Sequence, residues 1–449
     1  MVRQVFVARQ AQLTQLRSYL SQALDSHGQV AFVVGEAGSG KTALVTEFAS
    51  RAEQAQDDLV VVIGNCNAQT GIGDPYLPFR EILAQLTGDF EAKLAQGAIT
   101  AENARRLQGF VRWSCEALME FGPDLISVLV PGAGLLAKAG KFVVDQAGWL
   151  DRFKQLVESK TASPAASTLD QSHIFEQYTN VLKALAAKRP LVLVLDDLQW
   201  ADSASTSLLF HLGRRIGGSR ILVLGTYRPE EVKLGRGGER HPLEKVLAES
   251  KRYFGDVWID LDRAERDETR HFVDALLDLE PNRLGEAFRE SFVGHTEGHA
   301  LFAVELLRDM QERGDLEQDG GGRWIEGGRL DWHGLPARVE GVIEERIGRL
   351  NAELRDTLTI GSVEGEEFTA EVIARVRTVD ERGLVRSLSQ TLDKQHHLVV
   401  SQGMRRLGLQ PLSAYRFRHN LFQKFLYDDL DAAQRAYLHE DVGNALEAL

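Results

Sequence analysis

AFVVGEAGSGKTALVTEF, residues 31–48, contains the pattern G-x-x-x-x-G-K-[ST] over residues 35–42. An apolar run typical of a buried strand, residues 30–34, comes before the pattern, and an amphipathic helical pattern follows it. This order of strand, glycine-rich loop and helix is the context that a phosphate-binding P-loop requires. The alternative is a glycine-rich turn that happens to precede a helix, and the flanking strand and helix disfavour it.

Each residue type in this loop has a physical role. Its glycines allow positive φ, so that backbone N–H groups can curl around a phosphate. The helix that begins near Lys41 adds its unpaired N–H groups and the positive end of its dipole. We expect Lys41 to reach the β- and γ-phosphates and the Thr42 hydroxyl to bind Mg²⁺. The candidate nucleotide-binding residues of the loop are Gly35, Glu36, Ala37, Gly38, Ser39, Gly40, Lys41, Thr42 and Ala43.

The composition restricts the kind of protein. The chain has 449 residues, 52 basic and 65 acidic, and its net charge of −13 argues against a dominant nucleic-acid or membrane-binding surface. Its two cysteines, Cys66 and Cys115, form neither a disulfide framework nor a metal-binding spacing, which fits a reducing cytoplasm. The N-terminus lacks the apolar core of a signal peptide. The most apolar window, residues 125–139, is too short to span a bilayer, and a buried helical hairpin is favoured there.

A second chemical landmark is the run of five apolar residues 191–195, which ends at Asp196 and Asp197. Such a run is typical of a central strand that is buried on both faces. Ligands of open α/β sheets bind beyond the carboxyl ends of the strands, where these two acids lie. We therefore expect Asp196 to hold Mg²⁺, mostly through water, and Asp197 to orient or activate the attacking water. As an isolated pair, the two acids would more often form a turn.

A similar apolar run, residues 221–224, is followed by Thr226 and Arg228. These residues are expected at the same end of the sheet as Asp196. A polar residue there can sense the γ-phosphate, and an arginine can neutralise the charge that develops in phosphoryl transfer. The alternative is that Arg228 pairs with Glu230 or Glu231, as surface arginines often do.

The spacing of these runs predicts an α/β fold with a five-stranded parallel sheet. The strand candidates are residues 30–34, 59–63, 191–195, 221–224 and 257–261. We predict a P-loop domain over residues 1–262 with a helical insertion at about 88–170, a helical lid over 263–334, and a winged-helix domain over 335–430. Residues 431–449 begin a helical region, and the chain is a possible fragment of a longer protein.

Taken together, these residues resemble the STAND class of P-loop ATPases, the signal transduction ATPases with numerous domains. The likeness is to the AAA-like module of large ATP-binding LuxR-type regulators and related bacterial signalling proteins, and it covers nearly the whole chain. Its motifs are VVGEAGSGKT, PYLPFREIL, RPLVLVLDDLQWAD, ILVLGTYRPEEV, LPARVEGVIEERIGRL and YRFRHNLFQKFLYDDL.

The resemblance implies roles for particular residues. Lys41, Thr42, Asp196 and Asp197 would bind Mg-ATP, and Arg228 would read the γ-phosphate. A winged-helix histidine of the family contacts the phosphates in a closed, ADP-bound state. His419 is the best match, and a packed or capping histidine is the alternative.

Two motifs depart from the family pattern. In the N-terminal motif, which usually ends Gly-Arg-Glu, this chain has Ala8-Arg9-Gln10; Arg9 is retained as a candidate nucleotide-binding residue. The lid motif normally reads Gly-Asn-Pro, with its proline against the adenine, and here it is Gly298-His299-Ala300. Loss of the fixed φ and ring contact of proline would weaken base binding or loosen the closed state.

The resemblance therefore implies a switch that is closed with ADP, opens and self-associates with Mg-ATP, and resets by slow hydrolysis. The expected partners are ATP or ADP and an unidentified sensor or effector, with no membrane and no nucleic acid. Two rivals remain. One is a DNA-handling ATPase like the origin-recognition group, which the charge of −13 disfavours. The other is a scaffold that holds nucleotide without turnover, which the pair Asp196-Asp197 disfavours.

Overall fold

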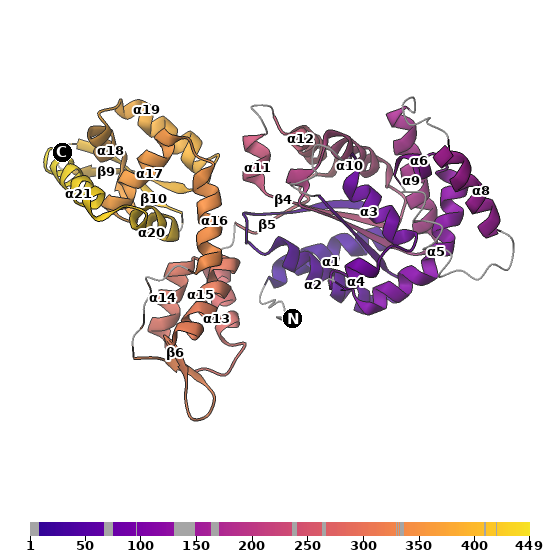
Figure 1. The fold of residues 1–449 in the computed structure, drawn as a ribbon, viewed down its shortest axis with the longest axis horizontal. Helices are drawn as coiled ribbons and strands as arrows, with labels where there is room; N and C mark the ends of the chain where they lie inside the picture. Colours follow the sequence, from indigo (N-terminus) through magenta and orange to yellow (C-terminus); the bar gives the residue numbers. More distant parts are fainter. Residues whose placement is uncertain are drawn as a thin grey trace. The chain divides into compact units, whose positions relative to one another are not determined.

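The computed structural model describes residues 9–66, 75–95, 97–129, 149–162, 170–235, 240–262, 266–328, 330, 332, 336–407, 410–418 and 420–449. The chain folds into two compact units, shown in Figure 1. The first comprises Met1–Glu36 and Gly40–Arg263, and the second comprises Ala37–Ser39 and Ala264–Leu449. The division of the second unit into a lid and a winged-helix domain stays a proposal.

The first unit is built on a five-stranded sheet in which every neighbouring pair of strands is parallel. The strands are β1 (Gln29–Val34), β2 (Val60–Asn65), β3 (Leu191–Asp196), β4 (Ile221–Tyr227) and β5 (Trp258–Asp260). Their order across the sheet is β2-β3-β4-β1-β5. The predicted α/β fold is confirmed, and all five strand candidates are strands.

Alternating side chains of each strand enter two different cores. Leu191, Leu193 and Leu195 of β3 pack into one core, whereas Val192 and Val194 pack into the other. This alternation follows from the two-residue period of a strand, and it explains why a strand covered on both faces is apolar at every position. The Val192 face is covered by α1 (Gln10–Leu24) and α2 (Lys41–Ala55). The Leu191 face is covered by α3 (Leu77–Leu86), α5 (Ala101–Phe121), α9 (Gln171–Lys188), α10 (Ser203–Arg215) and α12 (Pro242–Phe254).

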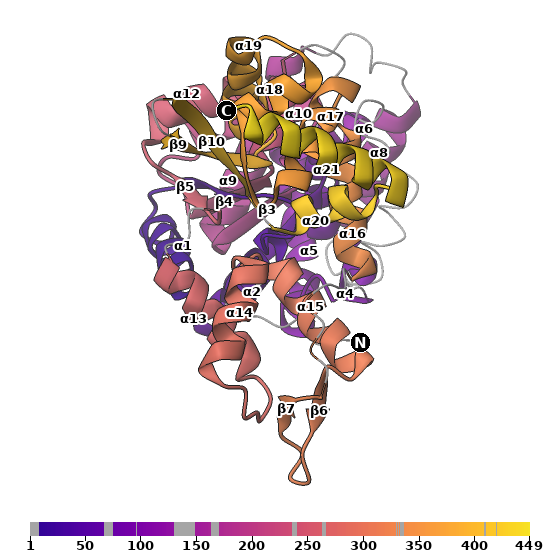
Figure 2. The ribbon, with the colours of Figure 1, turned by 90° about the vertical axis from the view of Figure 1, so that its left-hand side faces the viewer.

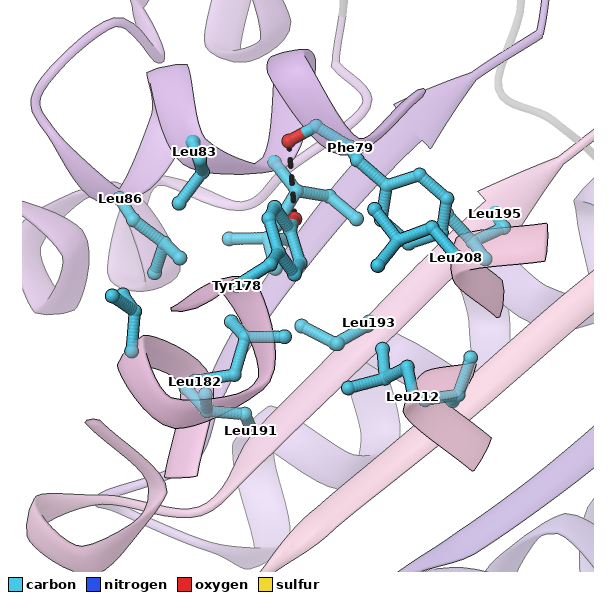
Figure 3. Close-up of a cluster of buried hydrophobic side chains, with 14 of the residues drawn as sticks. Phe79, Leu83, Leu86, Tyr178, Leu182, Leu191, Leu193, Leu195, Leu208 and Leu212 are labelled. Atoms are coloured by element: carbon cyan, nitrogen blue, oxygen red, sulfur yellow. Dashed lines mark hydrogen bonds between the residues drawn. The ribbon is translucent and has the colours of Figure 1, made fainter. Parts of the chain in front are cut away.

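Tyr178 joins α9 to α3 in the core on the Leu191 face of the sheet, as Figure 3 shows. Its side chain is fully buried, and its hydroxyl donates a hydrogen bond to the Phe79 carbonyl oxygen at 3.1 Å. The two rings meet edge to face with centroids 5.3 Å apart. The α3 helix begins at Leu77. Pro78 lies in the first turn of α3, where its missing N–H costs no helical hydrogen bond.

The expected insertion contributes further short helices to the first unit. Among the described residues, the insertion also contains α4 (Glu91–Ala95), α6 (Leu125–Val128) and α8 (Trp149–Ala162). The 3₁₀ helix η2 (Leu198–Trp200) and α11 (Pro229–Leu234) follow later in the first unit. Most of the predicted helical hairpin at 125–139 lies outside the described residues. No helix among the described residues is long and apolar enough to cross a membrane.

The second unit begins with helices and a small hairpin. The helices are α13 (Arg266–Leu277), α14 (Glu286–Thr296), α15 (Ala300–Arg313) and α16 (Ala337–Gly348). A turn or short hairpin is expected over residues 319–328, and the structure has an antiparallel hairpin of β6 (Leu316–Gln318) and β7 (Trp324–Glu326), visible in Figure 2.

Helices and a three-stranded antiparallel sheet follow. The helices are α17 (Ala352–Glu364), α18 (Ala370–Arg377), α19 (Glu381–Arg386), the π-helical η3 (Ser387–Asp393), α20 (Asn420–Asp428) and α21 (Ala432–Glu447). The strands are β8 (Glu367–Thr369), β9 (Val399–Leu407) and β10 (Gln410–Phe417), in the order β8-β10-β9. The sequence pattern did not reveal β8, which has only three residues. Phe368 of β8 packs on Tyr415 and Phe417 in the core of this region.

Candidate functional site

The glycine-rich loop between β1 and α2 has the backbone shape of a phosphate cradle. Gly38 and Gly40 have φ of 80° and 93°, which other residues rarely adopt. A Cβ added at Gly38 would also lie 2.7 Å from the Cβ of Leu301. Gly40 is the N-cap of α2, and no side chain caps this helix end. The first-turn N–H groups of α2 are therefore placed to bind an anion.

Ser39 adds a second observation that fits a phosphate. Its side chain is buried, and its hydroxyl oxygen has no hydrogen-bond partner within the described part of the chain. A buried polar group without a partner is costly, and a phosphate oxygen is one group that would satisfy it. The loop that the sequence predicts to bind nucleotide thus fits that ligand in both shape and hydrogen-bonding capacity.

Lys41, the first residue of α2, is folded back onto the loop. Its Nζ donates hydrogen bonds to the carbonyl oxygens of Gly35 at 2.8 Å and Glu36 at 2.7 Å. Burial, followed by the positive charge of Arg228, lowers the pKa of Lys41 to about 8, although nearby carboxylates, including those of Asp197 and Asp196, oppose the shift. The expected contact with a phosphate requires Nζ to exchange these carbonyl partners for phosphate oxygens.

The structure brings together the two residues expected to hold Mg²⁺. Thr42 in α2 donates a hydrogen bond from Oγ1 to Oδ2 of Asp196, the last residue of β3, at 3.2 Å. Burial is the main cause that raises the pKa of Asp196, and the hydrogen bonds from Thr226 and Thr42 oppose it. A hydroxyl and a carboxylate are oxygen ligands of the kind that Mg²⁺ prefers, so this pair fits the expected ion.

Thr226 connects Asp196 and Asp197 at the end of β3. Its buried hydroxyl donates to Asp196 Oδ1 at 2.5 Å and accepts the backbone N–H of Asp197 at 2.9 Å. Asp197 has φ of 59°, a left-handed conformation that is unusual for a residue with a side chain. Our expectation that Thr226 senses the γ-phosphate is not tested, and the structure shows a more immediate role in holding the two acids.

Arg228 directly follows β4 and forms the ion pair considered as the alternative above. Its Nη1 lies 2.8 Å from Oε1 of Glu231, three residues along the chain in α11. Its Nε is buried and has no hydrogen-bond partner among the described residues. Its effect on the pKa of Lys41 shows that the guanidinium also lies within electrostatic range of the phosphate loop. A role in reading the γ-phosphate stays a prediction.

The predicted residues at the chain's two extremes have different outcomes. Arg9 is the N-cap residue of α1, and its Nη1 donates to the carbonyl oxygen of Leu261 at 3.1 Å, which ties α1 to the end of the β5 region. A contact of Arg9 with nucleotide is not tested. His419 lies outside the described residues.

Three polar residues of this region were missed by the sequence analysis. Asp262, just beyond β5, accepts the backbone N–H of Glu36 at 2.8 and 3.1 Å. Asp262 follows the fifth strand at the ligand-binding edge of the sheet, so its place in the sequence could have identified it as a candidate site residue. Gln199 in η2 and His241 before α12 contact the Asp197 turn, and no spacing rule in the sequence singles them out.

His299 replaces the asparagine of the family's lid motif and makes two hydrogen bonds within the second unit. Its Nδ1 accepts the N–H of Phe302 at 3.4 Å as the N-cap of α15, so the proton lies on Nε2. Nε2 then donates to the carbonyl oxygen of Ala37 at 2.9 Å. A neutral histidine therefore supplies one acceptor and one donor, as an asparagine side chain does. The effect of this substitution on base binding is not tested.

Comparison with known families identifies the first part of the chain. Residues 5–224 match the family described as AAA ATPase domain. This part of the chain is similar to that family. This match agrees with the P-loop ATPase part of the expected resemblance, and an AAA ATPase domain implies nucleotide binding. A curated relative, an uncharacterized protein of Rhizobium meliloti (strain 1021), is 22% identical over 98% of this chain, which spans 37% of that relative's length.

Comparison with solved structures also finds similar chains. Cdc6p from Pyrobaculum aerophilum is 14% identical with a TM-score of 0.37, covering 100% of this chain and 96% of its own. A STAND protein with a tetratricopeptide repeat sensor from Pyrococcus horikoshii is 16% identical with a TM-score of 0.32, covering 99% of this chain and 46% of its own. The Orc1 protein of Aeropyrum pernix, solved in complex with DNA, is 15% identical with a TM-score of 0.36, covering 97% and 96%. The expectation that nucleic acid is not a partner of this chain gains no support from them.

Proposed function

We propose that this protein is a nucleotide-operated switch that binds ATP with Mg²⁺ and hydrolyses it slowly. The observation that carries the proposal is the convergence of Lys41, Thr42, Asp196 and Asp197 at one edge of the parallel sheet. These residues come from a loop–helix junction and from a strand 150 residues later in the chain, yet Thr42 and Asp196 share a hydrogen bond.

Each residue has a distinct role in this proposal. The N–H groups of the glycine-rich loop and the Lys41 ammonium hold the phosphates, and the Arg228 guanidinium offsets charge on the γ-phosphate. Thr42 and Asp196 would hold Mg²⁺, which when bound supplies positive charge to the phosphate oxygens. Asp197 orients the water that attacks the γ-phosphate, and its strained backbone is held by Thr226. Residues in strained conformations commonly serve such sites, because the surrounding structure fixes them.

Switching requires that ADP and ATP prefer different conformations. We propose that ADP favours a closed form and that Mg-ATP favours an open form that associates with further copies. A ligand must bind one state roughly ten-thousandfold more tightly to move a population from about 1:99 to about 99:1. The proposal therefore requires that ADP and ATP differ strongly in their affinity for the closed and open forms.

The first test separates binding from hydrolysis. Asp197→Ala is expected to retain ATP binding within a few fold and to lower the hydrolysis rate by about 100-fold or more, the range that a positioned acid or base supplies. The measurements are nucleotide titration calorimetry and phosphate release. Asp58→Ala, which removes an exposed carboxylate in the turn before β2, is the control and should behave as wild type. Equal ATPase rates for wild type and Asp197→Ala would exclude the assigned role of Asp197.

The second test concerns the switch itself. Protein purified without added nucleotide and then denatured is expected to release stoichiometric ADP, which chromatography identifies. Asp197→Ala loaded with Mg-ATP should be larger than the ADP form by light scattering. Release of ADP with no change in size would favour a nucleotide-holding scaffold. A gain of DNA affinity with ATP that falls steeply with salt, measured by fluorescence anisotropy, would favour the DNA-handling alternative.

A further inference from the structure

Gln199 lies inside the turn that carries Asp197, and its side chain bridges two strand ends. It is the middle residue of η2 and is 1% exposed. Its Nε2 donates a hydrogen bond to Asp197 Oδ1 at 2.8 Å, and its Oε1 accepts the backbone N–H of Arg228 at 3.1 Å. One buried amide thus connects the acid after β3 with the arginine after β4.

The backbone of Gln199 is anchored by a third element. His241 is the N-cap of α12, where its Nδ1 accepts the N–H of Leu243 at 3.1 Å. The proton therefore lies on Nε2, which donates to the Gln199 carbonyl oxygen at 2.8 Å. Since His241 is 2% exposed, this bond is shielded from water. The main chain of Gln199 is consequently held from outside the turn.

The hydrogen bonds of Asp197 divide into those that fix its main chain and one that orients its carboxylate. The N–H of Asp197 donates to Thr226, and its carbonyl oxygen accepts the N–H of Trp200 at 2.9 Å. These two bonds fix the main chain. The bond from Gln199 Nε2 is directed to the carboxylate itself, so it sets which way Oδ1 faces.

We propose that Gln199 is a positioning residue for ATP hydrolysis, which fixes the Asp197 carboxylate and couples its position to Arg228. Gln199 does not contact the reacting atoms in this assignment. It acts by presenting the other carboxylate oxygen of Asp197 to water, while the same amide holds the main chain of the arginine expected beside the γ-phosphate. The inference rests on the proposed role of Asp197.

Two substitutions separate this role from simple packing. Gln199→Met keeps the length of the side chain and removes both hydrogen bonds. Gln199→Glu keeps an acceptor for the Arg228 N–H and removes the donor to Asp197. Both variants should bind ADP and ATP within about threefold of wild type, while single-turnover hydrolysis falls about 10- to 100-fold, the loss expected when a reacting group is misplaced by about 1 Å.

The pH profile gives a readout that packing alone would not change. At low pH the introduced carboxyl of Gln199→Glu is protonated and can again donate a hydrogen bond to Asp197, so part of the lost rate should return. Gln199→Met should show no such recovery. Gln85→Met is the matched control, because Gln85 is also 1% exposed and bonds through its amide to the backbone of Ile63. It should lower the melting temperature without lowering the hydrolysis rate of the folded protein.

The outcomes distinguish the two proposals. Hydrolysis that is lost in Asp197→Ala and unchanged in both Gln199 variants would overturn this inference alone. Hydrolysis that survives Asp197→Ala would overturn the proposed function and this inference with it. Adding Gln199→Glu to Asp197→Ala should cause no further loss, because this variant keeps the acceptor for the Arg228 N–H and the donor that it removes acts only through the Asp197 carboxylate. A second, additive loss would contradict the positioning role.

Discussion

The phosphate loop and the strand ends after β3 and β4 supply the two halves of the candidate site, and they are held in different ways. At the strand ends, two side chains bond both to a carboxylate and to a backbone N–H. Thr226 binds the Asp196 carboxylate and the Asp197 N–H, and Gln199 binds the Asp197 carboxylate and the Arg228 N–H. In the loop, Lys41 donates hydrogen bonds to two backbone carbonyl oxygens, and Ser39 Oγ has no partner within the described residues. The strand ends are thus organised by the fold itself, whereas the loop must exchange hydrogen bonds when a phosphate binds.

This contrast predicts that substitutions in the loop affect binding and that those at the strand ends affect turnover. The largest effect is expected for Lys41→Ala. Loss of a charge-assisted hydrogen bond to phosphate should weaken ATP binding by at least about 100-fold, to the point where titration detects none. Lys93→Ala, which breaks a 2.9 Å ion pair with Glu81 elsewhere in the first unit, is the matched control. If Lys41→Ala retained its affinity for ATP, the proposed division between a loop that binds nucleotide and strand ends that serve turnover would be wrong.

The pH dependence of ATP affinity gives a second test of the phosphate loop, with an effect smaller than that of Lys41→Ala. The pKa of Lys41 is lowered to about 8, mainly by burial, so its charge is lost as the pH rises through that value. A bound phosphate favours the ammonium and raises this pKa, which means that binding takes up a proton above pH 8. ATP affinity should be constant well below pH 8 and fall by up to about tenfold per pH unit above it.

Calorimetry in buffers of different ionisation enthalpy measures that proton uptake directly. At pH 8.5 the wild type should take up a substantial fraction of a proton per ATP bound, in proportion to the neutral lysine in the free protein. An affinity that stays constant from about pH 7 to pH 9.5 would show that Lys41 remains charged in the loop, against the effect of its burial.

The sequence revealed those parts of the site whose chemistry follows from local order. The five strands were found because strands buried on both faces are apolar at every position, and Lys41, Thr42 and Asp196 were found because a motif or strand end fixes their place. Gln199 and His241 could not be found in this way. Their roles depend on a 3₁₀ turn meeting the N-terminus of α12, a contact between segments 42 residues apart that no periodicity records. The assignment of Lys41 to phosphate stays a prediction, and its bonds to the carbonyl oxygens of Gly35 and Glu36 are visible only in the folded loop.

The smallest effect is expected where the two regions influence each other, at the Arg228–Glu231 ion pair. Glu231→Gln keeps a hydrogen-bond acceptor for the guanidinium and removes the charge that competes with a phosphate. Because a partly screened ion pair is worth up to about 1 kcal/mol, ATP should bind about two- to fivefold more tightly. Glu244→Gln, at an exposed carboxylate in the first turn of α12, should leave affinity unchanged.

The comparison of ATP with ADP decides what this change means. If Arg228 reads the γ-phosphate, only ATP gains affinity in Glu231→Gln, because ADP lacks the group that the released guanidinium would meet. An equal gain for both nucleotides would place the influence of Arg228 on the loop as a whole, through the charge that already lowers the pKa of Lys41. Hydrolysis would then still depend on Asp197 and on Thr226 and Gln199, which hold it, but Arg228 would not sense the γ-phosphate. The end of β3 would serve the reaction, and the end of β4 would adjust nucleotide affinity.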